Sequence, residues 1–276
     1  MSDFDIRKFN NIPEWQSVRE IIDWIDNLAE DLAAHQRHIV AFNFAVHDLI
    51  AYGAEAVDPL VDRLLDTKNN WWMRWATTWV LQDIGDRRAV EPLWKIFNDT
   101  TRDLDFRYKA LMALSTFQDP RTFDALVTWL NAGNHLAIKG LGNLGDEAAV
   151  SFLTSFLDEE ERLIRDIVQL TRKSGYDSDK LDEMLKIAKE KFHERKLIIE
   201  ALAKIGGPEA VHLLSTLINA EEVYLQQLSK YDRQRRDAAY AVTQIDHPDS
   251  AAVLRAALTH PKYGVRRVAR RSWINR

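Results

Sequence analysis

The sequence has no cysteine among its 276 residues. Disulfide bridges, thiolate zinc sites, cysteine-ligated iron–sulfur clusters and cysteine nucleophiles are therefore excluded. The sequence also lacks an apolar run of about 18 residues, the length that a transmembrane helix requires. Its first residues, Met1–Asp5, are acidic rather than apolar, so no secretory signal peptide is expected there. These absences favour a soluble protein of the cytoplasm without a membrane partner.

An excess of positive charge is missing as well. The net charge is −5, so nothing attracts the chain as a whole to nucleic acid or to an anionic membrane. No P-loop, GxGxxG, GxSxG or HExxH motif occurs. Helical-repeat di-iron hydroxylases repeat a His-Glu pair, and this sequence has only His193-Glu194. His35 and His38 share a helical face, but no third ligand is grouped with them, so no metal site is predicted.

What the sequence does contain is a repeated unit. It reads GAEAVDPL at residues 53–60, GDRRAVEPL at 85–93 and GDEAAVSFL at 145–153, with DPRTFDAL at 119–126 and GGPEAVHLL at 206–214. Each copy begins with glycine or aspartate, and the marker is expected to open a helix bounded by glycine, aspartate or proline turn residues. One apolar position marks the unit, at spacings of 33, 33, 27, 31, 30 and 40 residues. The marker residues are Val57, Val90, Phe123, Val150, Leu181, Val211 and Ala251.

A second pattern lies upstream of these markers. An arginine stands seven residues before an apolar residue in most copies, whereas the third copy has Asn134 in its place. This pattern predicts a first helix in each unit, and we expect the arginine to tie helix starts to neighbouring turns. The arginines are Arg74, Arg107, Arg195, Arg235 and Arg266.

Two helices in about 30 residues is the HEAT-type pattern, and one such hairpin cannot bury its own apolar face. The sequence therefore predicts an all-α, HEAT-like α-solenoid, a superhelix of about seven helical hairpins over residues 38–276. Residues 1–37 are predicted to form an N-terminal capping region around an amphipathic helix at 13–34. The repeat register is weakest over 158–178, where Ser174–Ser178 is expected to be a loop.

Residues 71–79 read WWMRWATTW and hold four tryptophans. At 100° per residue, the tryptophans occupy an arc about 100° wide, opposite the aliphatic stripe of the same helix. Asp83 and Gln82 border this arc. The tryptophans either pack against the adjacent helix, where Phe42 and Phe44 offer aromatic partners, or form an exposed platform for a flat ligand or a partner protein.

The last 27 residues, from Ser250, contain seven basic residues and no acid. They form either a solvated capping face or a basic patch for an acidic protein or for ligand carboxylates. DNA is a weaker choice, because a HEAT-like DNA glycosylase would need a broad basic concave surface and this chain is acidic. The basic residues are Arg255, Lys262, Arg266, Arg267, Arg270, Arg271 and Arg276.

The stretch LIAYGAEAVDPLVDRL at residues 49–64 resembles the early repeats of the E/F-type phycobilin lyases. So do Asn69-Asn70, Arg74-Trp75-Ala76 and Ile84-Gly85-Asp86, which follow it. The detailed resemblance covers about residues 45–95. It departs from the family where Thr77 and Thr78 and two further tryptophans replace the usual alanines.

The resemblance implies a lyase that binds a linear tetrapyrrole, or bilin, and attaches it to a cysteine of a phycobiliprotein subunit as a thioether. The bilin would be a transferred ligand rather than a tightly bound cofactor. The acceptor would be an acidic protein, and a second lyase subunit or a homodimer is left open. The nucleophile would belong to the acceptor, which suits a lyase without cysteine.

The resemblance also implies roles for individual residues. Aromatic side chains would wall the bilin, cations would meet its propionates, and the Asp83 carboxylate would meet its protonated pyrrole nitrogens. Tyr108 and His135 are further candidates for the same cavity. The walls would be Trp72, Trp75 and Trp79, and the cations Arg74 or Arg107.

Two other classes of function remain open. One is a non-catalytic HEAT-repeat scaffold or chaperone in the assembly or breakdown of phycobilisomes. The other, less favoured, is a HEAT-like DNA glycosylase.

Overall fold

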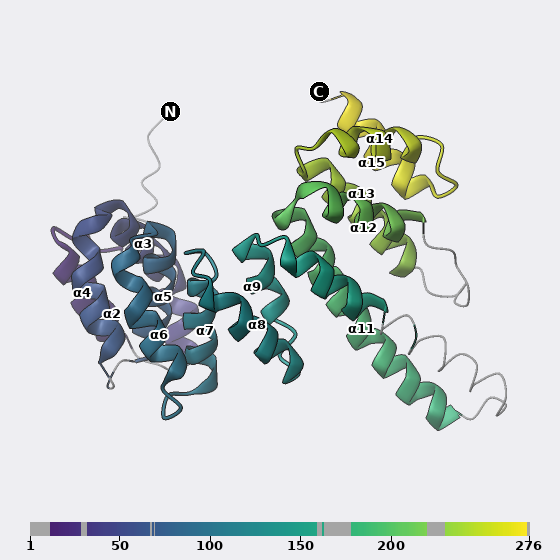
Figure 1. Cartoon of the computed structure of the whole chain (residues 1–276). Coiled ribbons are helices and arrows are strands. Elements are labelled where there is room, and N and C mark those ends of the chain that lie inside the picture. The colour runs from purple at the N-terminus through teal and green to yellow at the C-terminus, as the bar shows by residue number, and fades with distance from the viewer. Residues whose placement is uncertain are drawn as a thin grey trace. The chain divides into compact units, whose positions relative to one another are not determined.

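The computed structural model describes residues 12–28, 32–66, 68, 70–158, 162, 178–219 and 230–274. These residues form helices joined by turns, with no strand among them (Figure 1). No helix in these ranges is long and apolar enough to cross a membrane. The helices of the N-terminal half are α2 (Val18–Asp26), α3 (Leu32–Tyr52), α4 (Ala54–Leu65), α5 (Trp71–Ile84), η1 (Arg87–Ala89), α6 (Val90–Asn98) and α7 (Leu104–Leu114). Those that follow are α8 (Arg121–Asn131), α9 (Ala137–Leu144), a helix over 148–158, α11 (Ser178–Ile205), α12 (Gly207–Asn219), α13 (Lys230–Gln244), α14 (Pro248–Ala257) and α15 (Tyr263–Ile274).

Short polar side chains and glycines set the helix ends. Asn70 and Asp103 cap α5 and α7, and their side-chain oxygens accept hydrogen bonds from the backbone N–H groups of Met73 and Phe106, both at 2.8 Å. Such a cap satisfies one of the N–H groups that a helix leaves unpaired at its start. Helix α5 ends at Gly85, which has φ of 70°, a left-handed conformation that glycine adopts without steric cost.

The chain divides into two compact units, Met1–Thr122 and Phe123–Arg276. In the first unit, α5 packs between α3 and α7 in one layer, and α4 packs on α6 in the other. The short helix α2 contacts α3, α4 and α5. The core between the layers is aliphatic and aromatic, and its largest fully buried side chains include Phe42, Leu60, Trp72, Leu81 and Leu93.

The second unit repeats the same two-layer arrangement. Helix α11 packs on both α9 and α13, α13 packs on α15, and α12 packs on α14. Helices α9 and α11 approach closely because Gly142 has no side chain: a β-carbon there would lie 2.7 Å from the Cα atom of Ala201. Within each unit the hairpins stack on their neighbours, which confirms the predicted all-α, HEAT-like solenoid class.

A cross-tie joins consecutive repeats in the first unit. The Asp86 side chain accepts a hydrogen bond from the backbone N–H of Arg88 at 2.9 Å and from its guanidinium group. The same guanidinium reaches back to Asp58 in α4, with 2.8 Å between Nη1 and Oδ2. The turn therefore fixes an arginine that links α4 to the start of the next repeat.

The cross-tie recurs one repeat later but is missing at the turn that follows. Asp119 holds Arg121 in the same way, and Arg121 reaches Glu91 in α6 at 2.6 Å. At the next equivalent turn, Asp146 still accepts from the backbone N–H of Ala148 at 2.9 Å. Alanine has no guanidinium group, so this arginine tie is missing there.

The recurring arginines Arg107 and Arg266 donate hydrogen bonds to backbone carbonyls, the kind of tie between a helix and its neighbouring segment that the pattern predicts. Arg107 Nε donates to the carbonyl of Phe97 at 2.8 Å, and Arg266 Nη1 donates to the carbonyls of His260 and Pro261, both at 2.6 Å. Each of these arginines therefore satisfies carbonyl groups of the segment just before its own helix.

Some element boundaries differ from the prediction. The amphipathic helix expected over 13–34 is α2, which covers only Val18–Asp26. Leu181 was expected to begin a separate helix, but α11 runs through it to Ile205 without interruption, since no glycine or proline occurs in this segment. The predicted boundary between residues 37 and 38 falls inside α3 and stays a prediction. The loop predicted at residues 174–178 lies outside the described residues except for Ser178, with which α11 begins.

Candidate functional site

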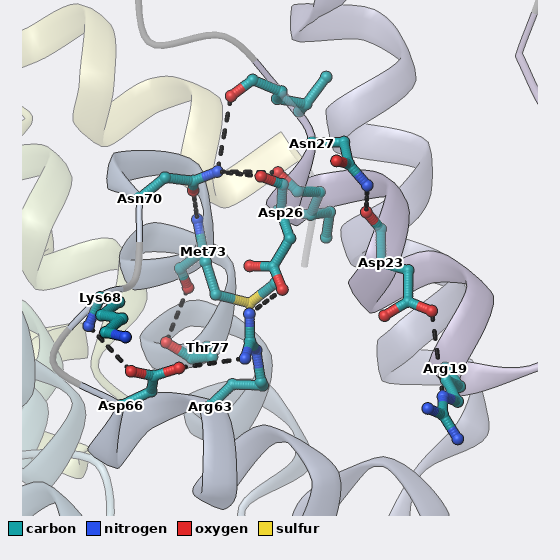
Figure 2. A network of polar contacts seen from close by, with 12 residues as sticks. Arg19, Asp23, Asp26, Asn27, Arg63, Asp66, Lys68, Asn70, Met73 and Thr77 are labelled. Carbon is teal, nitrogen blue, oxygen red and sulfur yellow. Dashed lines mark hydrogen bonds and ion pairs between the residues drawn. The ribbon is translucent and has the colours of Figure 1, made fainter.

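The start of α5 is fixed by a polar network at the junction of α2, α4 and α5 (Figure 2). The Asn70 side-chain amide donates to the carbonyls of Ile25 and Asp26, at 3.2 and 2.9 Å, while its oxygen caps α5. Arg63 of α4 pairs with the carboxylates of both Asp26 and Asp66. The network attaches the end of α2 to the first turn of α5, and so it sets where the tryptophans of α5 lie.

The four tryptophans of α5 do not share one environment. Trp72 is 1% exposed and packs its ring on Phe42 of α3, with centroids 4.8 Å apart, so this indole is part of the core. Trp71 is 37% exposed. Trp75 and Trp79 are half-buried. The structure therefore divides the predicted arc into a core tryptophan and three tryptophans that reach solvent, and we call Trp71, Trp75 and Trp79 the indole strip.

Ring contacts hold the indole strip together. Neighbouring centroids along it, from Trp71 to Trp75 and from Trp75 to Trp79, are 5.1 and 5.7 Å apart. Trp75 also stacks on Phe42 at 5.1 Å with an interplanar angle of 20°. Aromatic pairs at these separations attract each other beyond the effect of burial. The three indoles of the strip therefore restrict one another's positions and form one continuous aromatic surface.

A carboxylate stands at the C-terminal end of the strip. The Trp79 indole N–H donates to Asp83 Oδ2 at 3.0 Å, and the Trp79 ring lies edge to face with the ring of His47, with centroids 6.1 Å apart. Asp83 and His47 are both exposed. This hydrogen bond orients the Asp83 carboxylate beside the indole ring and leaves it accessible to a ligand that lies on the strip.

The 33-residue repeat places Phe42, Trp75 and Tyr108 at equivalent positions of α3, α5 and α7. Phe42 is fully buried, whereas Trp75 and Tyr108 are half-buried. Burial raises the pKa of the Tyr108 hydroxyl to about 12, and the nearby Asp105 carboxylate adds to the effect. Tyr108 is therefore a neutral hydrogen-bonding group at physiological pH, one repeat along from the strip.

The two candidate cations are engaged in the fold. Arg74 Nη1 lies 2.6 Å from Asp103 Oδ2, and its guanidinium carbon lies 5.7 Å from the centre of the Phe106 ring. Arg107 donates to Phe97 and lies 5.9 Å from the centre of that residue's ring. Both arginines tie α7 to its neighbours, so a propionate would have to compete with these contacts.

His135 belongs to the second unit, unlike the other candidates. Its Nδ1 lies 3.3 Å from Oε1 of Glu194, which is almost fully buried in α11, and its ring lies 6.2 Å from that of Phe156. His193, beside Glu194 in sequence, is exposed. No group of three or more histidine, aspartate or glutamate side chains that could hold a metal occurs among the described residues.

The residues gathered around the strip offer flat apolar faces, indole N–H groups and an exposed carboxylate. They suit a planar conjugated ligand that carries N–H groups or positive charge, because indole faces attract cations and a carboxylate accepts from N–H donors. The sequence pattern missed His47 as a neighbour of Trp79, because the two residues lie on helices that are separated by α4.

Two protein-family models match parts of the sequence, and both describe HEAT-type repeats. Residues 57–136 match the model of HEAT repeats, and residues 135–159 match that of the PBS lyase HEAT-like repeat. No curated protein matches the sequence. One similar solved structure is human deoxyhypusine hydroxylase in complex with glycerol, at 17% identity and a TM-score of 0.36, over 94% of this chain and 95% of that one. HEAT repeats and a PBS lyase HEAT-like repeat are thus found in residues 57–159 of this chain.

Proposed function

We propose that this protein is a bilin lyase, which binds a linear tetrapyrrole on the indole strip and transfers it to a cysteine of a phycobiliprotein subunit in the cytoplasm. The observation that carries the proposal is the strip itself, three solvent-reaching indoles that end at the oriented carboxylate of Asp83. The match of residues 135–159 to a PBS lyase HEAT-like repeat supports it. The bilin is a substrate here, and no resident cofactor is proposed.

The reaction needs little chemistry from the lyase. The acceptor thiol adds across the exocyclic double bond of the bilin: sulfur bonds to the ethylidene carbon, and the thiol proton goes to the adjacent ring carbon. No other group leaves and no oxidant is required. The lyase accelerates this addition by holding the extended bilin beside the acceptor cysteine, so that the reacting atoms are already in position. In this proposal Trp75 and Trp79 stack on the pyrrole rings, and Asp83 accepts from the pyrrole N–H groups.

The engaged arginines favour a second candidate, a non-catalytic scaffold for phycobiliproteins. Arg74 and Arg107 already bind Asp103 and the Phe97 carbonyl, so the strip has no uncommitted cation among the residues nominated for the propionates. A scaffold would use the strip to bind protein and would not take up pigment. The two candidates therefore differ in whether the purified protein binds bilin.

The test is uptake of phycocyanobilin by the purified protein, followed by the shift of the bilin absorbance band. We expect Trp75→Ala and Trp79→Ala to weaken binding by about 2 kcal/mol each if they are hot spots, roughly 30-fold in Kd. Asp83→Asn removes the carboxylate and should shift the absorbance of the bound bilin. The control is Trp273→Ala, which removes an exposed indole in the second unit and should leave uptake unchanged.

Transfer is measured afterwards with an apo-phycobiliprotein subunit and its cysteine→serine variant. A lyase gives a thioether that survives denaturation with the first subunit and none with the second. Absence of bilin binding by the unmodified protein would refute the lyase and leave the scaffold. Binding that survives both tryptophan substitutions would place the bilin elsewhere on the molecule.

A further inference from the structure

The exposed face of α15 consists of arginine and aromatic side chains. Val265 and Ala269 are buried against the rest of the second unit. Among the side chains of α15 whose exposure the structure describes, the exposed positions carry no acid and no aliphatic group. They are Tyr263, Arg267, Arg270, Arg271 and Trp273.

The neighbouring helix α13 extends this face. Arg233, Arg236 and Tyr240 are exposed on α13 at helical spacing, and Tyr240 is 61% exposed. A β-carbon at Gly264 of α15 would lie 3.7 Å from Cδ of Arg236, so the two stripes adjoin. Asp237 of α13 pairs with Arg236, with 3.3 Å between Oδ1 and Nη2. We call the exposed residues of α13 and α15 the arginine–aromatic face.

Three arginines of α15 are free of ion pairs within the part of the chain that the structure describes. Among the residues that the structure describes, no carboxylate lies within salt-bridge distance of Arg267, Arg270 or Arg271. Arg267 stands three and four residues before the other two, a spacing at which like charges repel on a helix. Arg266 differs from them, because its guanidinium is committed to the carbonyls of His260 and Pro261.

The aromatic side chains are exposed rather than folded into the core. Tyr263 is 65% exposed and Trp273 is 46% exposed. Arg266 lies 6.0 Å from the centre of the Tyr263 ring, and Arg255 of α14 lies 5.8 Å from that of Trp273. Tyrosine, tryptophan and arginine are the residue types that dominate the binding energy of protein interfaces. A purely solvated cap would need neither exposed rings nor clustered like charges.

We propose that the arginine–aromatic face docks an acidic protein, specifically a helix that presents carboxylates three and four residues apart. Arg267, Arg270 and Arg271 match that spacing, and bidentate arginine–carboxylate pairs would relieve their mutual repulsion. Tyr240, Tyr263 and Trp273 contact the apolar border of the same helix. The face does not insert into a membrane, because the apolar side of α15 is already buried. Nucleic acid suits it less, because the chain as a whole carries a net charge of −5.

The test uses the full chain and a fluorescein-labelled helical peptide of about 20 residues, near 30 Å long. The peptide carries glutamates at i, i+3 and i+4 on one face, and a twin peptide carries glutamines. We expect the glutamate peptide to bind, as measured by anisotropy, and its affinity to fall between about 50 and 200 mM salt as charges are screened. The twin should not bind. The probe contains no bilin, so the outcome is independent of the proposed lyase function.

Variants locate the binding on the face. Charge reversal at Arg267, Arg270 and Arg271 to glutamate should lower affinity at least tenfold, and their replacement by lysine, which keeps the charge and the fold, should lower it less. Tyr263→Ala with Trp273→Ala should weaken binding without changing its salt dependence. The matched control reverses Arg19, Arg87 and Lys95, three exposed cations of the first unit, and should bind as the unmodified protein does.

The proposal would be overturned by no peptide binding at low salt, equal binding of the glutamine twin, an equal loss in the control variant, or an unchanged affinity after charge reversal at α15. Polyuridylate and phosphatidylglycerol vesicles serve as competitors. Displacement of the peptide by either at a lower concentration than the unlabelled peptide itself would assign the face to nucleic acid or to a membrane surface.

Discussion

Trp72 and Trp79 lie seven residues apart on α5 and have opposite environments. Trp72 is enclosed by Phe42 and the core, whereas Trp79 is half-buried and binds Asp83 at the surface. We expect Trp72→Ala to lower the free energy of unfolding by about 3–5 kcal/mol, because it leaves a cavity in the core. Trp79→Ala should cost about 1 kcal/mol, close to the range of surface substitutions. Urea denaturation of both variants measures these losses of stability. Equal losses would contradict the assignment of Trp72 to the core and Trp79 to the surface.

Asp119 makes the stability of the first unit depend on pH. Hydrogen bonds from Arg121 lower the pKa of this buried carboxyl to about 2, below its unfolded value near 3.9. The stability that it contributes is complete above the unfolded pKa and is lost as the pH falls from about 4 through about 2. Arg121 is half-exposed, so the contribution is about 1 kcal/mol rather than the larger value that the shift alone would give.

The measurement is the urea midpoint between pH 6 and pH 2.5, compared with Asp119→Asn. At pH 6 the variant should be less stable than the unmodified protein. At the lowest pH the two proteins should have nearly the same stability. Parallel curves for the two proteins would show that Asp119 does not titrate in this range.

The sequence predicted the position of each tryptophan around α5 but could not divide the arc. Helical periodicity gives the angle of a side chain, not the extent to which the neighbouring helix covers it. Phe42 covers Trp72 fully and Trp75 in part, and this depends on how α3 packs beside α5. For the same reason the sequence could not show that Arg74 is paired with Asp103.

At the scale of the helix, Asn70 has two tasks that substitution can separate. Its oxygen caps α5, and its amide holds the carbonyls of Ile25 and Asp26. Asn70→Ala should cost about 1 kcal/mol for the cap and a further amount for the lost attachment of α2. Asn70→Asp keeps the cap but loses the amide donors. Its loss of stability therefore measures only the contribution of the hydrogen bonds that attach α2 to α5. Thermal unfolding of the two variants measures both terms, and an undiminished stability of Asn70→Asp would show that the attachment contributes nothing.

Two glycines of α9 offer a matched pair of substitutions. A β-carbon at Gly140 would meet a methyl group of Leu126, which can rotate away, whereas one at Gly142 would meet the backbone of Ala201 in α11. Alanine gains about 1 kcal/mol over glycine in a helix, so Gly140→Ala should be close to neutral. Gly142→Ala should lose about 1–3 kcal/mol, because the helices must separate. Differential scanning calorimetry distinguishes them, and a stabilised Gly142→Ala variant would contradict the close approach of α9 and α11.

At the scale of the whole molecule, the repeat register was predictable and the joining of helices was not. Glycine and aspartate at the turns mark where most helices begin, because these residues adopt conformations that end or cap a helix. Leu181 repeats the apolar marker without such a turn, so α11 continues through it. The arginine–aromatic face could be located in sequence as a basic segment, but the burial of Val265 and the exposure of Trp273 depend on the packing of α15.

The cross-ties of Arg88 and Arg121 also determine the order in which amide protons exchange with deuterated solvent. A helix that is tied to its neighbour opens only when the neighbour opens too, so the amides of α4 and α6 should exchange together and late. The helix over 148–158 has Ala148 where the tie would start, and it can open on its own at a lower free energy. Mass spectrometry of peptic fragments should therefore find residues 148–158 deuterated before residues 90–98. Replacing Arg88 by lysine, which loses the forked geometry, should bring α4 closer to the early group.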